Sequence, residues 1–459
     1  MFFEEILLNG QSSKPLYKQL EEAVIQGIRE KRLTSGYKIP SIRQLTAILN
    51  VSKPTVENAL KHLTNNGYLI AKDRSGFVVS NIPTAEIPIP LNEITSSKKQ
   101  ILFDFRNNAV DSIDFPAQQW RRSVSRAAKK KNFFSSYGDP AGELELRKAI
   151  ASYSAQSRGV VCNENQIVIG AGIQSLLPIL IRLLKRSDSV VYFHQKPSPH
   201  PLRIFEDHLI STQSFSFESL PKARNSILYM DTGTPLSVNQ LKGELRTQLL
   251  EWTGQCGHTL IEDDYLGEFR SLSDSPTSLQ GLFPGGRLIY LGSFSRLLTP
   301  ALRLSFMVLP LALIQEAREI LNDYNQTAST LEQLALADFI ESGQMRKHVR
   351  LLKAKNAKKI SILSGYLDRL PSQAFSSVET TGYGVQCLLP TSKIPLDFED
   401  HAEKYGLGIR VSRNNGTSIL TLAVSAINMD SMGIASERLI QLLSDTLFPE
   451  SQEKNSLNL

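Results

Sequence analysis

The sequence predicts an α/β protein of two domains, a small N-terminal winged helix-turn-helix and a larger domain with a mainly parallel sheet. The chain has 459 residues, more than one hydrophobic core usually serves. Residues 1–80 contain three short amphipathic patterns followed by a pair of short β-rich runs. Beyond residue 100, β-rich runs alternate with longer amphipathic segments, which indicates a mainly parallel sheet covered by helices.

The N-terminal domain is predicted from its helical periods and from the residues between them. Apolar residues recur at helical spacing in three segments, 15–30, 42–49 and 53–65. Between the last two lies Asn50-Val-Ser52, where Ser52 is placed to cap the next helix and Pro54 falls in its first turn. Residues 67–80 then indicate two strands around a polar turn. This order is typical of a helix-turn-helix with a wing.

The domain boundaries follow from changes in pattern. Residues 81–100 contain three prolines and no sustained period, so we expect an interdomain linker there. The expected division is therefore 1–80, linker 81–100, second domain 101–450 and a flexible polar tail 451–459. The strands expected in the second domain are Gln166–Ile169, Ser189–Phe193, Thr259–Ile261 and Arg287–Leu291.

Composition excludes several classes of protein. Cys162, Cys256 and Cys387 lie far apart without CxxC spacing, and the histidines show no ligand spacing, so we expect neither a disulfide framework nor a metal site. No uncharged apolar run reaches the length of a membrane span, and the N-terminus carries acids where a secretory signal needs basic residues. We therefore expect a cytoplasmic protein with no membrane role.

The charge distribution favours a polyanionic partner for the N-terminal domain without deciding the matter. The whole chain has a net charge of +6, and residues 1–80 alone hold 11 Lys or Arg against 7 Asp or Glu. Such an excess suits nucleic acid, but it equally suits a solvated surface.

Specific residues in the N-terminal domain match a known pattern. The runs that carry the match are Pro15-Leu-Tyr-Lys-Gln-Leu20, Gly36-Tyr-Lys-Ile-Pro40-Ser-Ile-Arg43, Val51-Ser-Lys-Pro-Thr55-Val-Glu-Asn58, Gly67-Tyr-Leu69 and Gly76-Phe-Val78. Over about 65 residues this resembles the winged helix of the GntR family of bacterial transcription regulators.

The resemblance implies a set of contacts to double-stranded operator DNA. Ser41 and Arg43 would hold phosphates or a base edge from the start of the second helix. The third helix would enter the major groove with Ser52, Lys53, Thr55 and Asn58. Backbone charge would be met by Lys61, Lys72 and Arg74, with Gly76 in the wing. Because one winged helix makes few contacts, we expect a homodimer on two half-sites.

Ordered blocks in the second domain carry a second resemblance. They are Phe103-Asp-Phe-Arg106, Phe115-Pro-Ala-Gln-Gln-Trp120, Tyr137-Gly-Asp-Pro-Ala-Gly142, Gly170-Ala-Gly172-Ile-Gln174, Ile261-Glu-Asp263-Asp-Tyr265 and Gly292-Ser-Phe-Ser295-Arg296 through Arg303. Together with the winged helix they resemble the MocR-type (GabR-like) subfamily of GntR regulators, which carries a fold-type I aminotransferase-like domain. That domain implies pyridoxal phosphate (PLP) or its amine form (PMP) as cofactor and a head-to-tail dimer.

The resemblance assigns a role to each cofactor-site residue. Gly172, Ile173 and Gln174 would hold the phosphate at a helix N-terminus, and Ser293, Ser295 and Arg303 would complete the cup. Tyr137 would reach that cup from the partner subunit. Asp263 would pair with the pyridine nitrogen and Tyr265 would donate to the ring hydroxyl.

One position departs from the family in a way that decides the chemistry. The family places its Schiff-base lysine immediately after the Ser-x-Ser, and this chain has Arg296 there. Attack on an aldehyde needs a neutral amine, and at a pKa of ~12.5 or above fewer than about one guanidinium in 10⁵ is neutral near pH 7. We therefore expect no catalytic residues and no ordinary transamination.

Further departures leave two interpretations of the cofactor pocket open. The family's ring-stacking aromatic is missing at or beside Pro199, Pro235-Leu-Ser237 replaces Pro-Thr-Gly, and Leu420 to Ser425 lacks Gly-Phe. The pocket either binds PLP, PMP or another anionic ligand non-covalently, or is filled by a structural Asp263–Arg296 pair.

Three functions are compatible with the sequence. The leading one is a DNA-binding regulator whose degenerate aminotransferase-like domain dimerises and senses a phosphorylated or anionic effector. The second is an active PLP-dependent aminotransferase with a DNA-binding arm, which needs the missing lysine. The third is a constitutive DNA-binding dimer with an inert second domain.

Overall fold

The computed structural model describes most of the chain. The described residues are 2–10, 12, 14–72, 76–81, 101–106, 110–130, 137–186, 189–194, 199–232, 243–255, 257–270, 277–414 and 416–448. Most of the predicted linker, the predicted tail and Arg74 lie outside them. The chain forms two compact units, Met1–Ser96 and Ser97–Leu459, each of which is described by itself.

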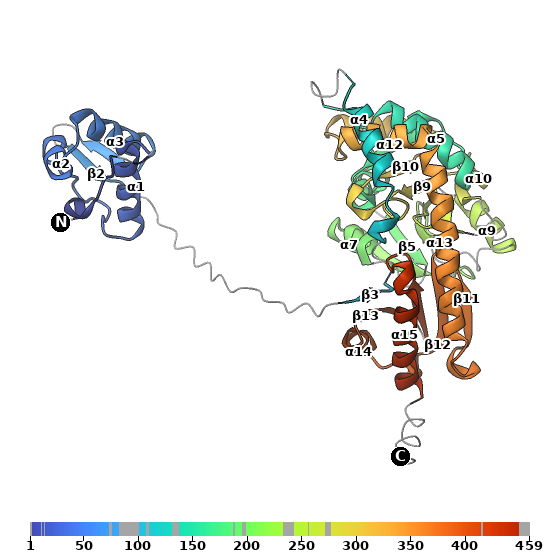
Figure 1. Cartoon of the computed structure of the whole chain (residues 1–459). Helices are drawn as coiled ribbons and strands as arrows, with labels where there is room; N and C mark the ends of the chain where they lie inside the picture. Colours follow the sequence, from blue (N-terminus) through green and yellow to red (C-terminus); the bar gives the residue numbers. More distant parts are fainter. Residues whose placement is uncertain are drawn as a thin grey trace, which may run out of the picture. The chain divides into compact units, whose positions relative to one another are not determined.

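The first unit is a winged helix. Its elements are η1 (Phe2–Glu5), α1 (Leu16–Arg29), α2 (Ile42–Leu49), α3 (Lys53–Asn65), β1 (Leu69–Lys72) and β2 (Gly76–Val79). The strands pair antiparallel as the wing (Figure 1). Apolar residues at helical spacing, such as Leu20, Leu45 and Leu63, are buried together, so the core follows from the amphipathic patterns. The predicted helices and strand pair are confirmed.

The turn between α2 and α3 is set by local chemistry. Ser41 opens α2 with a capping box, in which its hydroxyl and the Gln44 side chain each bond to the other residue's backbone. Asn50 ends α2 in the left-handed conformation, which Asn tolerates better than most residues. Ser52 stands at the N-cap of α3, but it makes no capping bond, because its hydroxyl pairs with that of Thr55 at 2.8 Å. Ser52 therefore occupies the predicted N-cap position, but the predicted hydrogen bond from its side chain to the helix backbone is absent.

The second unit is built around a seven-stranded sheet. In spatial order its strands are β4 (Ile167–Gly170), β10 (Ser305–Val308), β9 (Leu288–Ser293), β8 (Thr259–Asp263), β7 (Ile227–Asp231), β5 (Val190–His194) and β6 (Ser211–Phe215). From β9 to β6 all neighbours are parallel, whereas β10 runs antiparallel to β4 and β9. The expected mainly parallel sheet is confirmed, and the four predicted strands correspond to β4, β5, β8 and β9.

Helices pack around this sheet and link it to a smaller one. They are α4 (Ala117–Ala127), α5 (Leu144–Arg158), α6 (Ile173–Leu184), α7 (Pro199–Asp207), α9 (Glu244–Thr253), α10 (Leu279–Leu282), α11 (Ile314–Asn322), α12 (Thr330–Glu341), α13 (Gln344–Leu367), α14 (Phe398–Lys404) and α15 (Met432–Leu447). The long α13 runs from α12 down to the small sheet, where it packs beside α15 (Figure 1). Among the described residues, no helix is long and apolar enough to cross a membrane.

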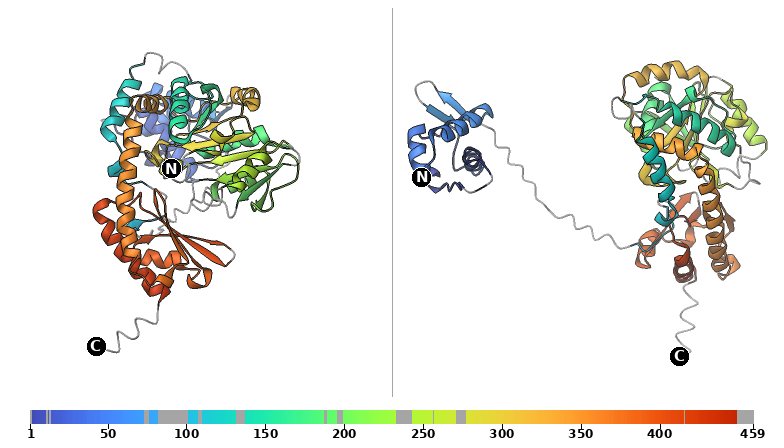
Figure 2. Two further views of the ribbon diagram at one scale, coloured as in Figure 1. Left: turned by 90° about the vertical axis from the view of Figure 1, so that its right-hand side faces the viewer. Right: turned by 45° about the horizontal axis from the view of Figure 1, so that its top comes forward.

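The smaller sheet forms a second core at the other end of this unit. Its antiparallel strands are, in order, β11 (Ser377–Thr380), β12 (Gly384–Pro390), β15 (Thr417–Ala423) and β14 (Arg410–Asn414). Figure 2 shows α13 and α15, in orange and red, against one side of it. The chain enters this core through β3 (Phe103–Asp104), which pairs parallel with β13 (Leu407–Gly408).

A buried ionic cluster fixes the segment that follows β8. Asp264 is almost fully buried and accepts hydrogen bonds from Arg158 Nε at 2.7 Å, Arg270 Nη2 at 3.1 Å, the Tyr290 hydroxyl at 3.1 Å and the Thr232 hydroxyl at 3.2 Å. Four donors compensate the cost of burying this carboxylate. Because Asp264 lies between Asp263 and Tyr265, the cluster also holds those two residues in place.

Removing this acceptor should destabilise the second unit strongly. Asp264→Ala removes the buried carboxylate that pairs with Arg158 and Arg270, so we expect a loss of about 3–5 kcal/mol in the free energy of unfolding. Asp323→Ala is the matched control, because its ion pair with Arg182 is exposed and should contribute less than about 1 kcal/mol. Denaturant unfolding measures both variants, and equal losses would contradict the assigned role.

Candidate functional site

The site lies at one edge of the large sheet, where the carboxyl ends of the parallel strands meet. Strand register aligns the residues there. Ser305 pairs with both Gly170 and Ser293, and Asp263 pairs with both Asp231 and Leu291. Since neighbouring strands lie about 4.8 Å apart, these strand ends are close neighbours. Ligands of open α/β sheets bind at such an edge.

Asp263 is the most unusual acid at this edge. It is only 6% exposed, and its Oδ2 accepts a hydrogen bond of 2.5 Å from the Tyr229 hydroxyl. Its Oδ1 is buried and has no hydrogen-bond partner among the described residues. Burial, and then the charge of Asp231, raise the pKa of Asp263 well above its ordinary value. The carboxylate is therefore held in place with one acceptor atom unsatisfied.

Three tyrosines belong to this part of the fold. Tyr229 and Tyr383 are buried, and Tyr265 is half-buried. Burial raises the pKa of each hydroxyl, and the charge of Asp231 adds to the effect. Tyr265 follows β8, whereas Tyr383 lies beside β12 of the small sheet. The site thus lies where the two cores of the second unit meet.

Arg296 occupies the position after Ser293 and Ser295, at the end of β9. Burial lowers the pKa of its guanidinium, and the groups that raise that pKa are Tyr265, Asp104 and Tyr383. The pKa of Asp263 is shifted by its burial and by three residues, Asp231, Tyr229 and Asp264. None of these three is a cation. The charges that act on Arg296 are thus those of Tyr265, Asp104 and Tyr383.

Two residues of the predicted phosphate cup, Gly172 and Arg303, lie together at the start of α6. Gly172 is the N-cap with a φ of +88°, and no side chain of the described residues caps the helix. A Cβ at Gly172 would come within 3.0 Å of Arg303 Nη2, so the arginine lies directly against this glycine. Arg303 itself adopts a left-handed φ of +51°, which costs an L-residue about 1–2 kcal/mol. Despite this conformational cost, Arg303 lies beside the N-terminus of α6.

The remaining cup residues divide into two groups. Ile173 and Gln174 form the first turn of α6, as predicted. Ser293 accepts bonds from the Ser305 hydroxyl at 3.1 Å and from the Ser295 amide at 3.3 Å, so its oxygen is already engaged within the chain. Tyr137 is 86% exposed. Gln195 to Ser198, the side chain of Pro199 and residues 235–237 lie outside the described part.

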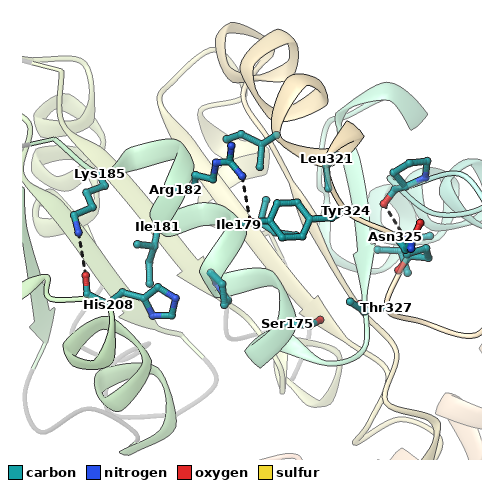
Figure 3. Close-up of a pocket in the computed structure, with 15 residues that line it drawn as sticks. Ser175, Ile179, Ile181, Arg182, Lys185, His208, Leu321, Tyr324, Asn325 and Thr327 are labelled. Carbon is teal, nitrogen blue, oxygen red and sulfur yellow. Dashed lines mark hydrogen bonds between the residues drawn. The ribbon is translucent and has the colours of Figure 1, made fainter. Parts of the chain in front are cut away.

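A separate cavity of about 360 Å³ lies between α6 and α11 (Figure 3). Its walls are mostly apolar, and its two basic residues are engaged. Arg182 donates to the Tyr324 hydroxyl at 3.1 Å, and Lys185 donates to the His208 carbonyl at 3.1 Å. Asp263, Arg296 and Arg303 do not line it.

Of the described residues, no group of three or more His, Cys, Asp and Glu is arranged to hold a metal.

Most of the predicted DNA-contact residues of the first unit are exposed to solvent. Val56, Ala59, Leu60 and Leu63 turn one face of α3 into the core. The predicted contact residues outside that face are exposed, except for the half-buried Thr55: Ser41, Arg43, Ser52, Lys53, Asn58, Lys61, Lys72 and Gly76. Lys53 forms an exposed i,i+4 ion pair with Glu57 at 3.4 Å.

Family models match both units. Residues 16–79 match the bacterial regulatory proteins of the gntR family, and residues 98–219 match aminotransferase class I and II. A helix-turn-helix transcriptional regulator of Bacillus subtilis, YhdI, is 36% identical over 391 residues, covering 82% of each chain. The chain belongs to the GntR-type transcriptional regulators that carry an aminotransferase-like domain.

Other relatives agree with this assignment. The probable rhizopine catabolism regulatory protein MocR of Rhizobium meliloti is 26% identical over 386 residues, covering 77% of each chain. Among solved structures, a kynurenine aminotransferase of Pyrococcus horikoshii matches with a TM-score of 0.62 at 18% identity, covering 76% of this chain and 92% of that one. This match shows that the second unit of the regulator has the aminotransferase fold.

Several residues of the site were not anticipated. Asp231 and Tyr229 come from β7, whose short apolar run Ile-Leu-Tyr-Met before an acid is itself a strand signal. Applying the rule that ligands bind at carboxyl ends of strands would have found Asp231. Tyr383 comes from a distant part of the chain, and no local pattern marks it. Asp104 lies in the quoted block Phe103-Asp-Phe-Arg106, but nothing in that block indicates its influence on Arg296.

The buried state of Asp263 makes a testable prediction about stability. Its folded pKa exceeds its unfolded value, so its stabilising contribution is complete below the unfolded pKa and is lost as the pH rises through the folded pKa. Asp263→Asn removes that penalty, so the ligand-free variant should be more stable than the wild type near pH 8 by roughly 1–2 kcal/mol. The difference should shrink toward pH 4.

Thermal unfolding across this pH range measures the effect. The exposed Asp368→Asn is the control and should behave as the wild type. A variant less stable than the wild type at pH 8 would show that Asp263 is an ordinary structural carboxylate.

Proposed function

We propose that this regulator binds operator DNA as a homodimer and that its second unit holds a phosphorylated B6 compound without a covalent bond. The observation that carries the proposal is the buried Oδ1 of Asp263, which has no hydrogen-bond partner in the described part of the chain and lies at the same sheet edge as Gly172 and Arg303. An anion-binding helix end and an unsatisfied acid on one edge suit a ligand that has a phosphate and a protonated ring nitrogen.

DNA reading rests on the exposed side chains of α2 and α3. Arg43 in the first turn of α2 and the Ser41 segment would hold phosphates or a base edge. Asn58 and Lys53 would face the major groove, where an amide suits adenine and a cation suits guanine. On DNA, Lys53 would exchange its exposed pair with Glu57 for contacts to the duplex. Lys61, Lys72, Arg74 and Gly76 would follow the backbone.

Dimerisation supplies the second half-site. One winged helix makes too few contacts for useful affinity at physiological salt, so two readers are needed. The 86% exposure of Tyr137 supports a head-to-tail dimer, because a large aromatic ring so exposed is available to a second copy. In that dimer Tyr137 of the partner subunit would complete the phosphate cup.

The residues of the pocket fit a B6 phosphate. The phosphate would lie at the α6 N-terminus beside Arg303 and Ser295, with the Gly172 position free of the Cβ that would crowd Arg303. Asp263 Oδ1 would accept from the protonated ring nitrogen, and Tyr265 would donate to the ring hydroxyl. In enzymes of this fold the cofactor supplies an electron sink for amino acid chemistry.

Arg296 separates this pocket from an enzyme active site. A guanidinium that stays charged cannot bond to the aldehyde carbon, so ligand exchange would be reversible. We therefore propose that the ligand acts as an effector, which shifts the regulator between states of different DNA affinity.

Replacing Arg43 tests the DNA contact. Arg43→Ala should weaken operator binding, and the slope of log K against log salt should fall by about 1, because one phosphate contact is lost. Arg29→Ala removes an exposed arginine from α1 and is the matched control. Binding is measured by fluorescence anisotropy at several salt concentrations, and an unchanged slope would count against a contact at Arg43.

Restoring the lysine tests the role of Arg296. Arg296→Lys should allow covalent attachment of PLP to the chain, which mass spectrometry detects after borohydride reduction. Arg296→Met, which removes the charge without adding an amine, should show no adduct at that residue. If Arg296→Lys forms no adduct there, the pocket is filled by side chains rather than open.

The effect of a ligand on DNA affinity separates the proposal from its rivals. If PLP or PMP stabilises the protein and changes operator affinity, the second unit senses it. If neither ligand binds while operator binding persists, the chain is a constitutive dimer with an inert second unit. Turnover of an amino acid with PLP by the wild type would make the chain an aminotransferase with a DNA-binding arm.

A further inference from the structure

The long helix α13 of the second unit carries charges of one sign only. Its 24 residues, Gln344–Leu367, include seven Lys or Arg and no Asp or Glu. Exposed helices usually mix both signs, because opposite charges one turn apart stabilise a helix and like charges weaken it. Helix α7 follows this rule, with Arg203 and Asp207 paired at 3.0 Å. The stability of α13 alone therefore does not explain its charge pattern.

Three of the seven cations have partners within the second unit. Lys355 forms an ion pair with Asp114, and Lys359 lies 3.7 Å from the same carboxylate. Lys353 donates a hydrogen bond to the Arg270 carbonyl at 3.4 Å. These three contacts join α13 to neighbouring parts of the fold, so the structure accounts for them.

The other four cations share one exposed face of the helix. They are Arg346, Lys347, Arg350 and Lys358, and no carboxylate of the described residues forms an ion pair with them. At 100° per residue they fall within ~120° of the helix circumference, on the side away from the buried Leu352. At 1.5 Å per residue they extend over ~18 Å. We call these four residues the α13 basic face. In the left view of Figure 2, α13 (orange) runs along the outside of the second unit.

Duplex DNA is the polyanion that suits the α13 basic face. It carries one phosphate charge per ~1.7 Å of helix axis, so a stretch as long as this face presents about ten phosphates. Lys and Arg bind such phosphates whatever the base sequence, with release of counterions. The same chain has a winged helix of the gntR family, a DNA-binding module, at residues 16–79. DNA is therefore the polyanion that this chain meets in its own function.

The segment between the two units is long enough for both to contact one duplex. Residues 81–100 lie between the last strand of the winged helix and the first strand of the second unit. At ~3.3–3.6 Å per residue this segment alone can span up to about 70 Å. One turn of duplex is ~34–36 Å long, so that reach corresponds to about two turns.

We propose that the α13 basic face binds the phosphate backbone of the same duplex that the winged helix reads. The inference goes beyond the proposed function, because it adds a DNA contact outside the winged helix and requires no ligand in the second unit. The contact is made to backbone charge, so it adds affinity without reading the base sequence.

Removing the four charges together tests the proposal. Arg346→Gln, Lys347→Gln, Arg350→Gln and Lys358→Gln are combined in one full-length variant. The probe is a fluorescein-labelled duplex of ~60 base pairs, selected from a random pool with the wild-type protein, and anisotropy is read from ~50 to ~200 mM salt. Each phosphate contact contributes ~0.9 to the slope of log K against log salt, so the slope should fall by at least ~2. Binding at ~100 mM salt should weaken at least ~10-fold.

A matched variant separates a local contact from a general effect of net charge. Lys222→Gln, Arg224→Gln, Lys393→Gln and Lys404→Gln together remove four charges from exposed positions elsewhere on the second unit. This variant should keep the wild-type slope within ~0.5. Urea unfolding of both variants should match that of the wild type, because every substituted residue is exposed.

The possible results differ in what they reject. A slope that stays within ~0.5 of the wild-type value in the α13 variant, or that falls equally in the matched variant, would overturn the proposal and leave the winged helix as the DNA reader. If the wild type selects and binds no duplex at all, the proposed function fails as well.

Discussion

The structure of the second unit depends on how a buried acid is held at the carboxyl end of β8. Four donors fix Asp264, and the residues on either side of it, Asp263 and Tyr265, are placed at the sheet edge as a result. Of the residues that the structure describes, none pairs with Oδ1 of Asp263, and burial beside Asp231 makes the charge of this carboxylate costly. A buried carboxylate whose charge is destabilised at a ligand-binding edge can be stabilised by a cation that binds beside it.

Arg296 changes what that capacity can do. The second unit has the fold of an aminotransferase-like domain, and we propose that the nucleophile of that fold is replaced here by a group that stays charged near neutral pH. The same chain carries a winged helix of the GntR family. We propose that the second unit binds its ligand reversibly and, joined to the winged helix, acts as a sensor rather than as a catalyst.

Local patterns predicted the elements well, because helix periods and strand runs depend on residues close in sequence. The three helices of the winged helix and the strands β4, β5, β8 and β9 are cases of this kind. The aminotransferase fold was predicted from ordered blocks and a family resemblance.

The local patterns did not predict which residues would lie near Asp263 and Arg296. Tyr383 and Asp104 reach the site from the small sheet and from β3, and only the tertiary fold brings them there. The Ser52 hydroxyl likewise found a side-chain partner, Thr55, that the capping rule does not consider.

An open pocket that holds a B6 phosphate reversibly is the central proposal, and equilibrium dialysis of the full-length protein against radiolabelled PMP tests it most directly. We expect saturable uptake approaching one ligand per chain, complete release on dilution, and loss of uptake in Asp263→Asn. Absence of uptake by the wild type, or a label that survives denaturation, would contradict the proposal.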